Sequence, residues 1–189
     1  MFLFFDTETT GLPLDWRAPL ENLDNWPRLV QLAWLLTDKN GKEVKSISKI
    51  IKPEGFIIPA EAAAVHGIST ERAQVEGVLL PAALKEFSEA VDEAKILVAH
   101  NMSFDEKIMG AELLREKQEH KLFERPKICT MQSSTQYCKI ENDYGYKWPK
   151  LIELHQKLFS EEFDNAHDAL ADVKACARCF FELMKRRVI

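Results

Sequence analysis

The sequence has no excess of positive charge, few cysteines and no long apolar run, and each of these features argues against a class of protein. No apolar stretch approaches the roughly eighteen residues that a membrane-spanning helix needs. The formal net charge of −5 argues against a protein that coats nucleic acid by bulk electrostatics. It leaves open an enzyme whose basic groups gather near one cleft.

The N-terminal segment MFLFFD has no basic residue before its apolar run and becomes acidic at Asp6, so it is not a secretory signal peptide. We therefore expect a cytoplasmic protein that has no membrane partner. Its four cysteines, Cys129, Cys138, Cys176 and Cys179, should then be reduced thiols. Cys176 and Cys179 form a CxxC pair inside a long helical pattern. We interpret the pair as helix packing, with a zinc or redox site as the alternative.

The length and composition predict one soluble domain spanning residues 1–189. A chain of 189 residues can bury a substantial core and is short for two domains. It is 46% hydrophobic and 29% charged, which is ordinary for a globular protein, and it contains no internal repeat, low-complexity tract or linker.

The hydrophobic pattern alternates between strand and helix signals. Short apolar or alternating runs predict strands at 2–5, 29–38, 43–53, 96–100 and 127–131. Lys39-Asn40-Gly41 is a good turn between the second and third strands, which should pair antiparallel. Helices are expected after Pro59 up to Gly67, from Ser69-Thr70, at 80–94, from Asn101 as N-cap, around 151–158 and at 166–186. The fold class is therefore α/β.

The stretch FLFFDTETTGL places two carboxylates, Asp6 and Glu8, at the end of a buried strand. Residues i and i+2 of a strand point to the same face, so these like charges should lie side by side where water is scarce. Either the strand ends in solvent at Asp6, or something strongly positive lies between the two side chains.

Two further segments carry acids that can complete such a site. Asp105 follows the strand at 96–100, and Asp172 lies on the last helix, five residues after His167. Carboxylates are the usual protein ligands of hard divalent cations, and two such ions can drive a phosphoryl displacement. Spacing alone leaves the alternatives open: a solvated strand end for Asp6 and Glu8, a helix-dipole acid for Asp105, and a cap or surface residue for His167.

The three segments DTETTGL, VAHNMSFD and HDALAD, in this order, resemble the motifs of the DEDD exonucleases of the histidine-containing kind. That superfamily includes the proofreading subunit of the bacterial replicative polymerase, ribonuclease T and oligoribonuclease. AVHGIS at 64–69 also resembles the family segment between the first two motifs. The resemblance covers residues 2 to about 180. It implies a ribonuclease H-like fold, a mixed five-stranded sheet flanked by helices, with the first three strands antiparallel.

The resemblance also implies roles for individual residues. Asp6, Glu8, Asp105 and Asp172 would be ligands of two divalent ions, Mg²⁺ or Mn²⁺, and His167 would be the general base. A histidine suits that role because its ordinary pKa lies near neutrality. Among substrate-binding residues, Leu12 matches the position that packs against the terminal base. Thr9 lies where backbone contacts hold the terminal sugar.

The segment PLDWRAPLENLDNWP, residues 13–27, is longer than in many family members. It is either a surface loop pinned by Trp16 and Trp26 or an element that stacks on the substrate. We expect Trp26 to be structural and Trp16 to be the candidate for substrate contact.

The leading hypothesis is a magnesium- or manganese-dependent 3′–5′ exonuclease that acts on single-stranded or frayed 3′ ends and releases nucleoside 5′-monophosphates. The alternative is a nucleic-acid-binding subunit of a polymerase complex with little or no catalysis. Polymerase subunits or a second copy of the chain are further partners that the resemblance leaves open. The sequence does not separate DNA from RNA, because the catalytic ions contact only phosphate.

Overall fold

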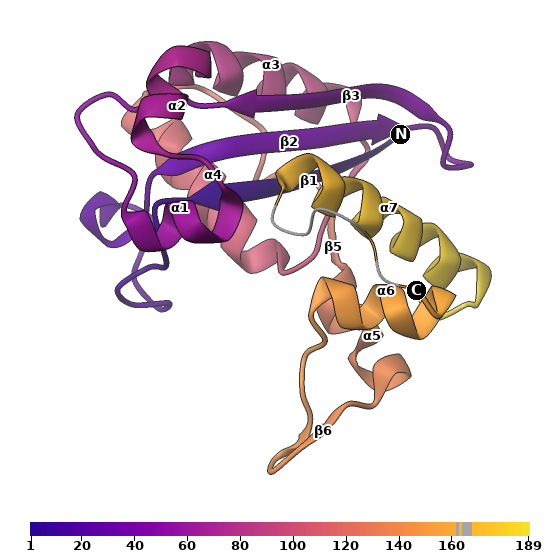
Figure 1. Ribbon diagram of the computed structural model, residues 1–189. Coiled ribbons are helices and arrows are strands. Elements are labelled where there is room, and N and C mark those ends of the chain that lie inside the picture. The colour runs from indigo at the N-terminus through magenta and orange to yellow at the C-terminus, as the bar shows by residue number, and fades with distance from the viewer. Residues whose placement is uncertain (162, 164–167) are drawn as a thin grey trace.

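A computed structural model describes residues 1–161, 163 and 168–189, and its centre is a twisted five-stranded sheet (Figure 1). The strands lie in the order β3-β2-β1-β4-β5. Their bounds are Phe2–Thr9, Leu29–Thr37, Glu43–Ile50, Ile96–Ala99 and Lys127–Cys129 for β1 to β5. β2 pairs antiparallel with both β1 and β3, whereas β4 is parallel to β1 and β5 is parallel to β4. The predicted mixed sheet with three antiparallel N-terminal strands is confirmed.

The helices alternate with the later strands and cover both faces of the sheet (Figure 1). Their bounds are Ala60–His66, Thr70–Glu76, Leu80–Glu93, Met102–Arg115, Thr130–Cys138, Leu151–Phe159 and Ala169–Lys185 for α1 to α7. A 3₁₀ turn, Leu23–Asn25, lies in the loop before β2, and a small hairpin of β6, Glu141–Asn142, and β7, Gly145–Tyr146, lies between α5 and α6.

The alternation of β1 divides the core into two layers. Leu3 and Phe5 are buried with residues of α3 and α4 on one face of the sheet. Phe4 is buried on the other face against α7, where its ring centroid lies 5.3 Å from that of Phe180. Aromatic pairs at this distance add to the burial of apolar area. Helix α7 is thereby fixed along β1, with its N-terminal end over the acidic end of the strand.

The last helix also settles the interpretation of the CxxC pair. Cys176 and Cys179 are 3% and 0% exposed and belong to the apolar clusters beneath α7. Burial raises the pKa of both thiols, that of Cys179 to about 12. A thiol that resists ionisation is a poor nucleophile, and the predicted packing role is confirmed.

Several element boundaries differ from the predictions. β1 extends to Thr9, because antiparallel pairing with β2 continues past the apolar run. The fifth strand ends at Cys129, and Thr130 begins a helix, α5, that the sequence did not predict. Asn101 precedes α4 as expected, but it adopts a left-handed conformation (φ 75°) and its side chain makes no capping bond. The predicted start of the last helix at Ala166 lies outside the described residues.

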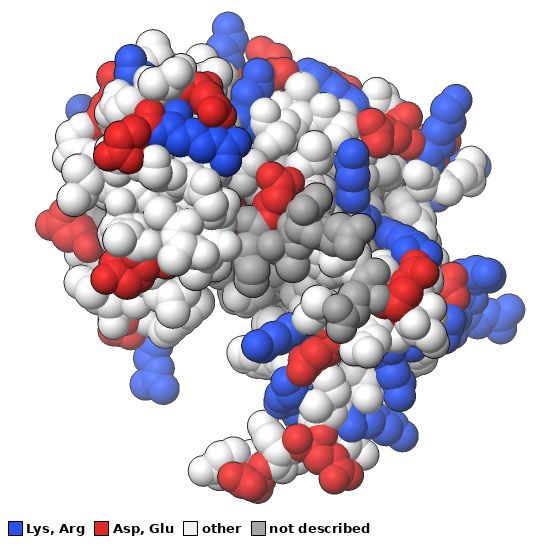
Figure 2. Space-filling model, viewed as in Figure 1, with Lys and Arg blue, Asp and Glu red and all other residues white. Residues whose placement is uncertain are grey.

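The surface carries charges of both signs interspersed over the face shown in Figure 2. No helix among the described residues is long and apolar enough to cross a membrane.

Candidate active site

The candidate site begins where β1 extends beyond its parallel neighbour. β4 pairs with β1 only as far as Phe4, opposite Val98, and the chain leaves the sheet after Ala99. From Asp6 onward one edge of β1 is therefore open, while the other edge remains paired with β2. Asp6 and Glu8 follow Phe2 and Phe4 on the face toward α7, as the two-residue period requires.

The open edge of β1 is bonded by a side chain of α4. Asp105 Oδ1 accepts hydrogen bonds from the backbone N–H of Thr7 at 3.0 Å and from the Thr7 hydroxyl at 2.8 Å. Asp105 is 2% exposed and lies in the first turn of α4. The carboxylate thus takes the place of a strand partner for Thr7 and fixes the start of α4 beside Asp6.

Helix α7 brings the third segment to the same place. Asp168 caps the helix by accepting from Leu170 N and Ala171 N, both at 3.1 Å. The Gln31 side chain of β2 donates to Asp168 at 3.3 Å. With this end of the helix fixed, Asp172 in its first turn lies with Asp6 and Glu8, and oxygen atoms of the three carboxylates are all within 4.8 Å of one another.

Burial and proximity raise the pKa values of three of these acids. Burial, followed by the charges of Asp105, Asp172, Glu8 and Asp168, raises the pKa of Asp6 well above its ordinary value. Burial and the charge of Asp172 raise the pKa of Glu8 to about 8. Burial raises the pKa of Asp105 to about 7, although the bonds from Thr7 oppose the shift. Such a cluster resists full ionisation unless positive charge is added, and clustered perturbed acids are typical of functional sites.

Two hollows meet at this cluster. One has a volume of about 350 Å³ and is lined by Asp6, Glu8, Asp105 and Asp172 together with the side chains of Leu12, Trp16 and Phe104. The other, about 320 Å³, shares Asp6, His100 and Asp172 and extends to Lys150, Leu151 and Ile152 at the start of α6. Asp6 and Asp172 therefore line both cavities, and Glu8 and Asp105 line only the first.

His100 joins the site to the segment that precedes α6. Its ring nitrogens lie 2.9 Å from Thr130 Oγ1 and 2.9 Å from the Pro149 carbonyl oxygen. A carbonyl only accepts, so Nε2 carries a proton and donates it to Pro149. Burial lowers the pKa of His100 to about 4, which keeps the ring neutral. Nothing in the sequence linked His100 to Pro149.

The loop at 13–27 presents one tryptophan to the site and buries the other. Trp26 is 2% exposed, packs with Ala18 and Ala111, and donates from Nε1 to the Pro19 carbonyl at 3.1 Å. Trp16 is 49% exposed, and its ring centroid lies 5.8 Å from that of Phe104. The expected structural placement of Trp26 is confirmed, and Trp16 lines the pocket of the acids.

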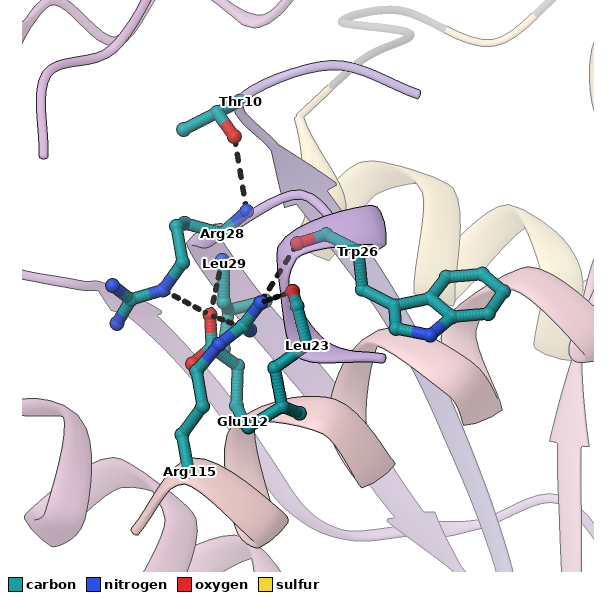
Figure 3. A network of polar contacts seen from close by, with 7 residues as sticks. All are labelled: Thr10, Leu23, Trp26, Arg28, Leu29, Glu112 and Arg115. Carbon is teal, nitrogen blue, oxygen red and sulfur yellow. Dashed lines mark hydrogen bonds and ion pairs between the residues drawn. The ribbon is translucent and has the colours of Figure 1, made fainter. Parts of the chain in front are cut away.

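A buried ionic network ties this loop to α4 (Figure 3). Glu112 is 0% exposed, and its Oε1 accepts from Leu29 N and from Arg28 Nε, both at 2.9 Å. Arg115 donates to the Trp26 carbonyl at 2.8 Å and lies 3.2 Å from Glu112. The helix that carries Asp105 therefore also holds the C-terminal end of the loop that carries Trp16.

The structure brings most of the predicted site residues together. Asp6, Glu8 and Asp172 form one cluster, Asp105 lines the same pocket, and His167 lies outside the described residues. Leu12 is 71% exposed and lines the pocket, so it is not part of the core.

Thr9 lies beside Glu8. The Thr9 hydroxyl donates a hydrogen bond to the Gly11 carbonyl at 2.6 Å, so this side chain is bonded within its own turn. The sequence did not identify Thr7, which holds Asp105. A threonine within a strand carries no signal of such a bond.

Comparison with known proteins identifies the class to which this fold and acidic site belong. The family model described as Exonuclease, RNase_T, matches residues 3–180. The chain belongs to this family of nucleases, and the predicted membership of the histidine-containing DEDD exonuclease superfamily is confirmed. No curated protein matches the sequence.

Solved structures of E. coli Exonuclease I share the fold. The complex with a dT13 oligonucleotide has a TM-score of 0.78 and 22% identity, covering 98% of this chain and 41% of that chain. The zinc-bound complex with single-stranded DNA has a TM-score of 0.79 and 20% identity, covering 99% and 41%. The ribonuclease H-like exonuclease fold is thus confirmed. This chain spans about two-fifths of the Exonuclease I chains that it matches.

Proposed function

We propose that this protein is a metal-dependent 3′–5′ exonuclease that hydrolyses the terminal phosphodiester of a nucleic acid and releases a nucleoside 5′-monophosphate. The observation that carries the proposal is the cluster of Asp6, Glu8 and Asp172 within 4.8 Å, with Asp105 in the same pocket, in a member of an exonuclease family. The zinc-bound Exonuclease I structure is consistent with divalent metal use by this fold.

The acidic side chains fit divalent metal ions. The cluster offers only carboxylate oxygens, which are the ligands that Mg²⁺ and Mn²⁺ prefer. Burial and mutual repulsion raise the pKa values of Asp6, Glu8 and Asp105, so cations would relieve a charge that the fold otherwise disfavours. We propose that these three residues and Asp172 hold two such ions. When bound, the ions supply Lewis-acid activation of water and stabilisation of the leaving oxygen.

The protein's own residues would then position a metal ligand and deprotonate the attacking water. Thr7 holds Asp105 by two hydrogen bonds, so this ligand is fixed before metal arrives. His167 would accept the proton of the attacking water as general base, as its place in the third motif implies. The 3′-oxygen of the penultimate nucleotide would leave, and the terminal nucleotide would depart with the 5′-phosphate.

The pocket supports a substrate with an unpaired 3′ end. Leu12 and Trp16 are both exposed and line the same hollow as the acids, where an apolar contact and an indole can hold an unpaired base. Exonuclease I structures with single-stranded oligonucleotides support the same substrate form.

The test is product analysis on matched single-stranded DNA and RNA oligonucleotides labelled at the 5′ end, with and without Mg²⁺. We expect a ladder of products shortened from the 3′ end, mononucleotide release, and no reaction in excess EDTA. The matched control is Asp6→Asn, which keeps side-chain volume and removes one charge. Oligonucleotide binding without any shortening, by wild type and variant alike, would favour the non-catalytic binding subunit.

A further inference from the structure

We propose that residues 139–150, here called the arm, bind the single-stranded nucleic acid upstream of the terminal nucleotide, through stacking on Tyr146 and Trp148. The proposal rests on the function proposed above and adds to it a second contact region outside the acidic pocket. The arm connects α5 to α6 and projects away from the sheet and its covering helices (Figure 1).

The arm is a formed hairpin with its own backbone bonds. β6 and β7 pair antiparallel, with Glu141 opposite Tyr146, and Lys147 N donates to the Ile140 carbonyl at 2.8 Å. Tyr144 N donates to the Asn142 side chain at 2.9 Å, and Gly145 has φ of 119°, which favours glycine at the turn. These bonds order a segment that contributes little to the core.

The arm concentrates exposed aromatic side chains. Tyr144, Tyr146 and Trp148 are 98%, 39% and 61% exposed. Tyr146 and Trp148, with Asn142 and Lys147, line a hollow of about 430 Å³ that is separate from the two at the acids. Clustered exposed aromatics on a hydrogen-bonded hairpin are typical of a binding surface, and every nucleobase offers a face for stacking.

The arm is continuous with the acidic site. Two residues after Trp148, Lys150 lines the hollow that contains Asp6 and Asp172. Between them the Pro149 carbonyl accepts the hydrogen bond from His100, which fixes the root of the arm to the end of β4. Two extended residues span about 7 Å. A strand whose 3′ end lies at the acids can therefore reach Trp148 with its next nucleotides.

The charge pattern indicates which part of the arm a phosphate backbone can approach. Lys150 is exposed at the root, whereas Lys147 is paired with Glu153 at 2.6 Å. Asp143 lies in the turn at the tip, and Glu141 lies opposite Tyr146. Figure 2 shows acidic side chains at the tip, with basic ones nearer the body. The strand should accordingly contact the root and the Tyr146–Trp148 hollow and avoid the tip.

The experiment compares a dinucleotide, which can fill only the acidic pocket, with a twelve-nucleotide single strand. Binding is measured by fluorescence anisotropy in the Asp6→Asn background, and dinucleotide hydrolysis is measured in the otherwise wild-type enzyme with Mg²⁺. The variants are Trp148→Ala, Trp148→Phe, which keeps a stacking ring, and Tyr144→Ala at the acidic tip as the matched control. Thermal unfolding verifies that each variant is folded.

We expect Trp148→Ala to weaken binding of the long strand about 5-fold to 100-fold, the range for loss of one stacked base. Trp148→Phe should restore most of the affinity, and Tyr144→Ala and all dinucleotide rates should stay close to the parent values. Unchanged long-strand affinity in a folded Trp148→Ala, with dinucleotide still hydrolysed, would overturn the arm proposal alone and leave the surface to a protein partner. If the parent enzyme hydrolysed neither the dinucleotide nor the oligonucleotides of the product analysis above, the proposed function would fail, whereas the arm would still be judged by the binding data.

Discussion

Glu8→Gln should make the metal-free protein more stable at alkaline pH and leave its stability unchanged in mild acid. Folding raises the pKa of Glu8 from 4.5 to about 8 because the side chain is partly buried among Asp172, Asp105 and Asp168. Between these two values the folded state binds more protons than the unfolded state. The free energy of unfolding therefore falls as pH rises through that window.

The size of the change in the free energy of unfolding follows from the pKa shift of Glu8. One pKa unit corresponds to about 1.4 kcal/mol, so the full shift of Glu8 would amount to about 5 kcal/mol. Glu8 keeps some contact with solvent, which screens the repulsion, and we expect about 1–3 kcal/mol to be recovered by the glutamine. Near pH 5 the wild-type carboxyl is largely neutral in the folded state, and the two proteins should unfold alike.

The assay is urea denaturation of wild type and Glu8→Gln at pH 5, 7 and 9 in EDTA, repeated with Mg²⁺. Added metal should reverse the order at pH 9, since the ions bind the native carboxylate and stabilise only the protein that has it. A difference between the two proteins that is constant across pH in EDTA would refute the idea that repulsion and burial dominate at this site.

The remaining predictions concern the base, the metal and the loop. His167→Ala should lower the rate by about 10²–10⁴ with little change in metal affinity, measured by single-turnover kinetics and metal titration; a collapse of metal affinity would make His167 a ligand. Calcium should support oligonucleotide binding but little hydrolysis, because its looser coordination misplaces the reacting groups; equal turnover with calcium and magnesium would contradict this. Trp26→Ala should cost about 3–5 kcal/mol of stability, whereas Trp16→Ala should weaken single-strand binding about tenfold and barely change the melting temperature; the reverse pattern would exchange their roles. Glu112→Gln should destabilise the fold by about 3–5 kcal/mol, measured by urea denaturation, because Arg28 and Arg115 lose the charge that pairs them in the interior.

The sequence predicted the sheet well and singled out acids that the structure brings together, because both rest on strong local signals. Short apolar or alternating runs marked the strands, and the three acidic motifs matched a family whose model covers residues 3–180. The antiparallel pairing of β2 and β3 followed from the Asn-Gly turn, where Gly41 has the expected positive φ of 86°.

The arm and the contacts of His100 were beyond such reasoning. β6 and β7 have two residues each, too few to display alternation, and the arm has no apolar face that would mark it as structure. His100 bonds to Thr130 and Pro149, residues 30 and 49 positions away, and no local pattern encodes partners at that separation. Asn101 looked like an ordinary N-cap, yet its left-handed backbone leaves the capping role unfilled.

The early end of β4 has a consequence for how the site can vary. Four residues long, the strand stops level with Phe4, and Asp105 supplies to Thr7 the acceptor that another strand residue would have supplied. The opening at the acids is thus a missing piece of sheet, and its size depends on chain length between Ala99 and Asp105 more than on any side chain. Substitutions can change the shape of such an opening. An insertion that extended the pairing of β4 with β1 by two residues would instead fill it with backbone, while every acidic residue stayed in the sequence.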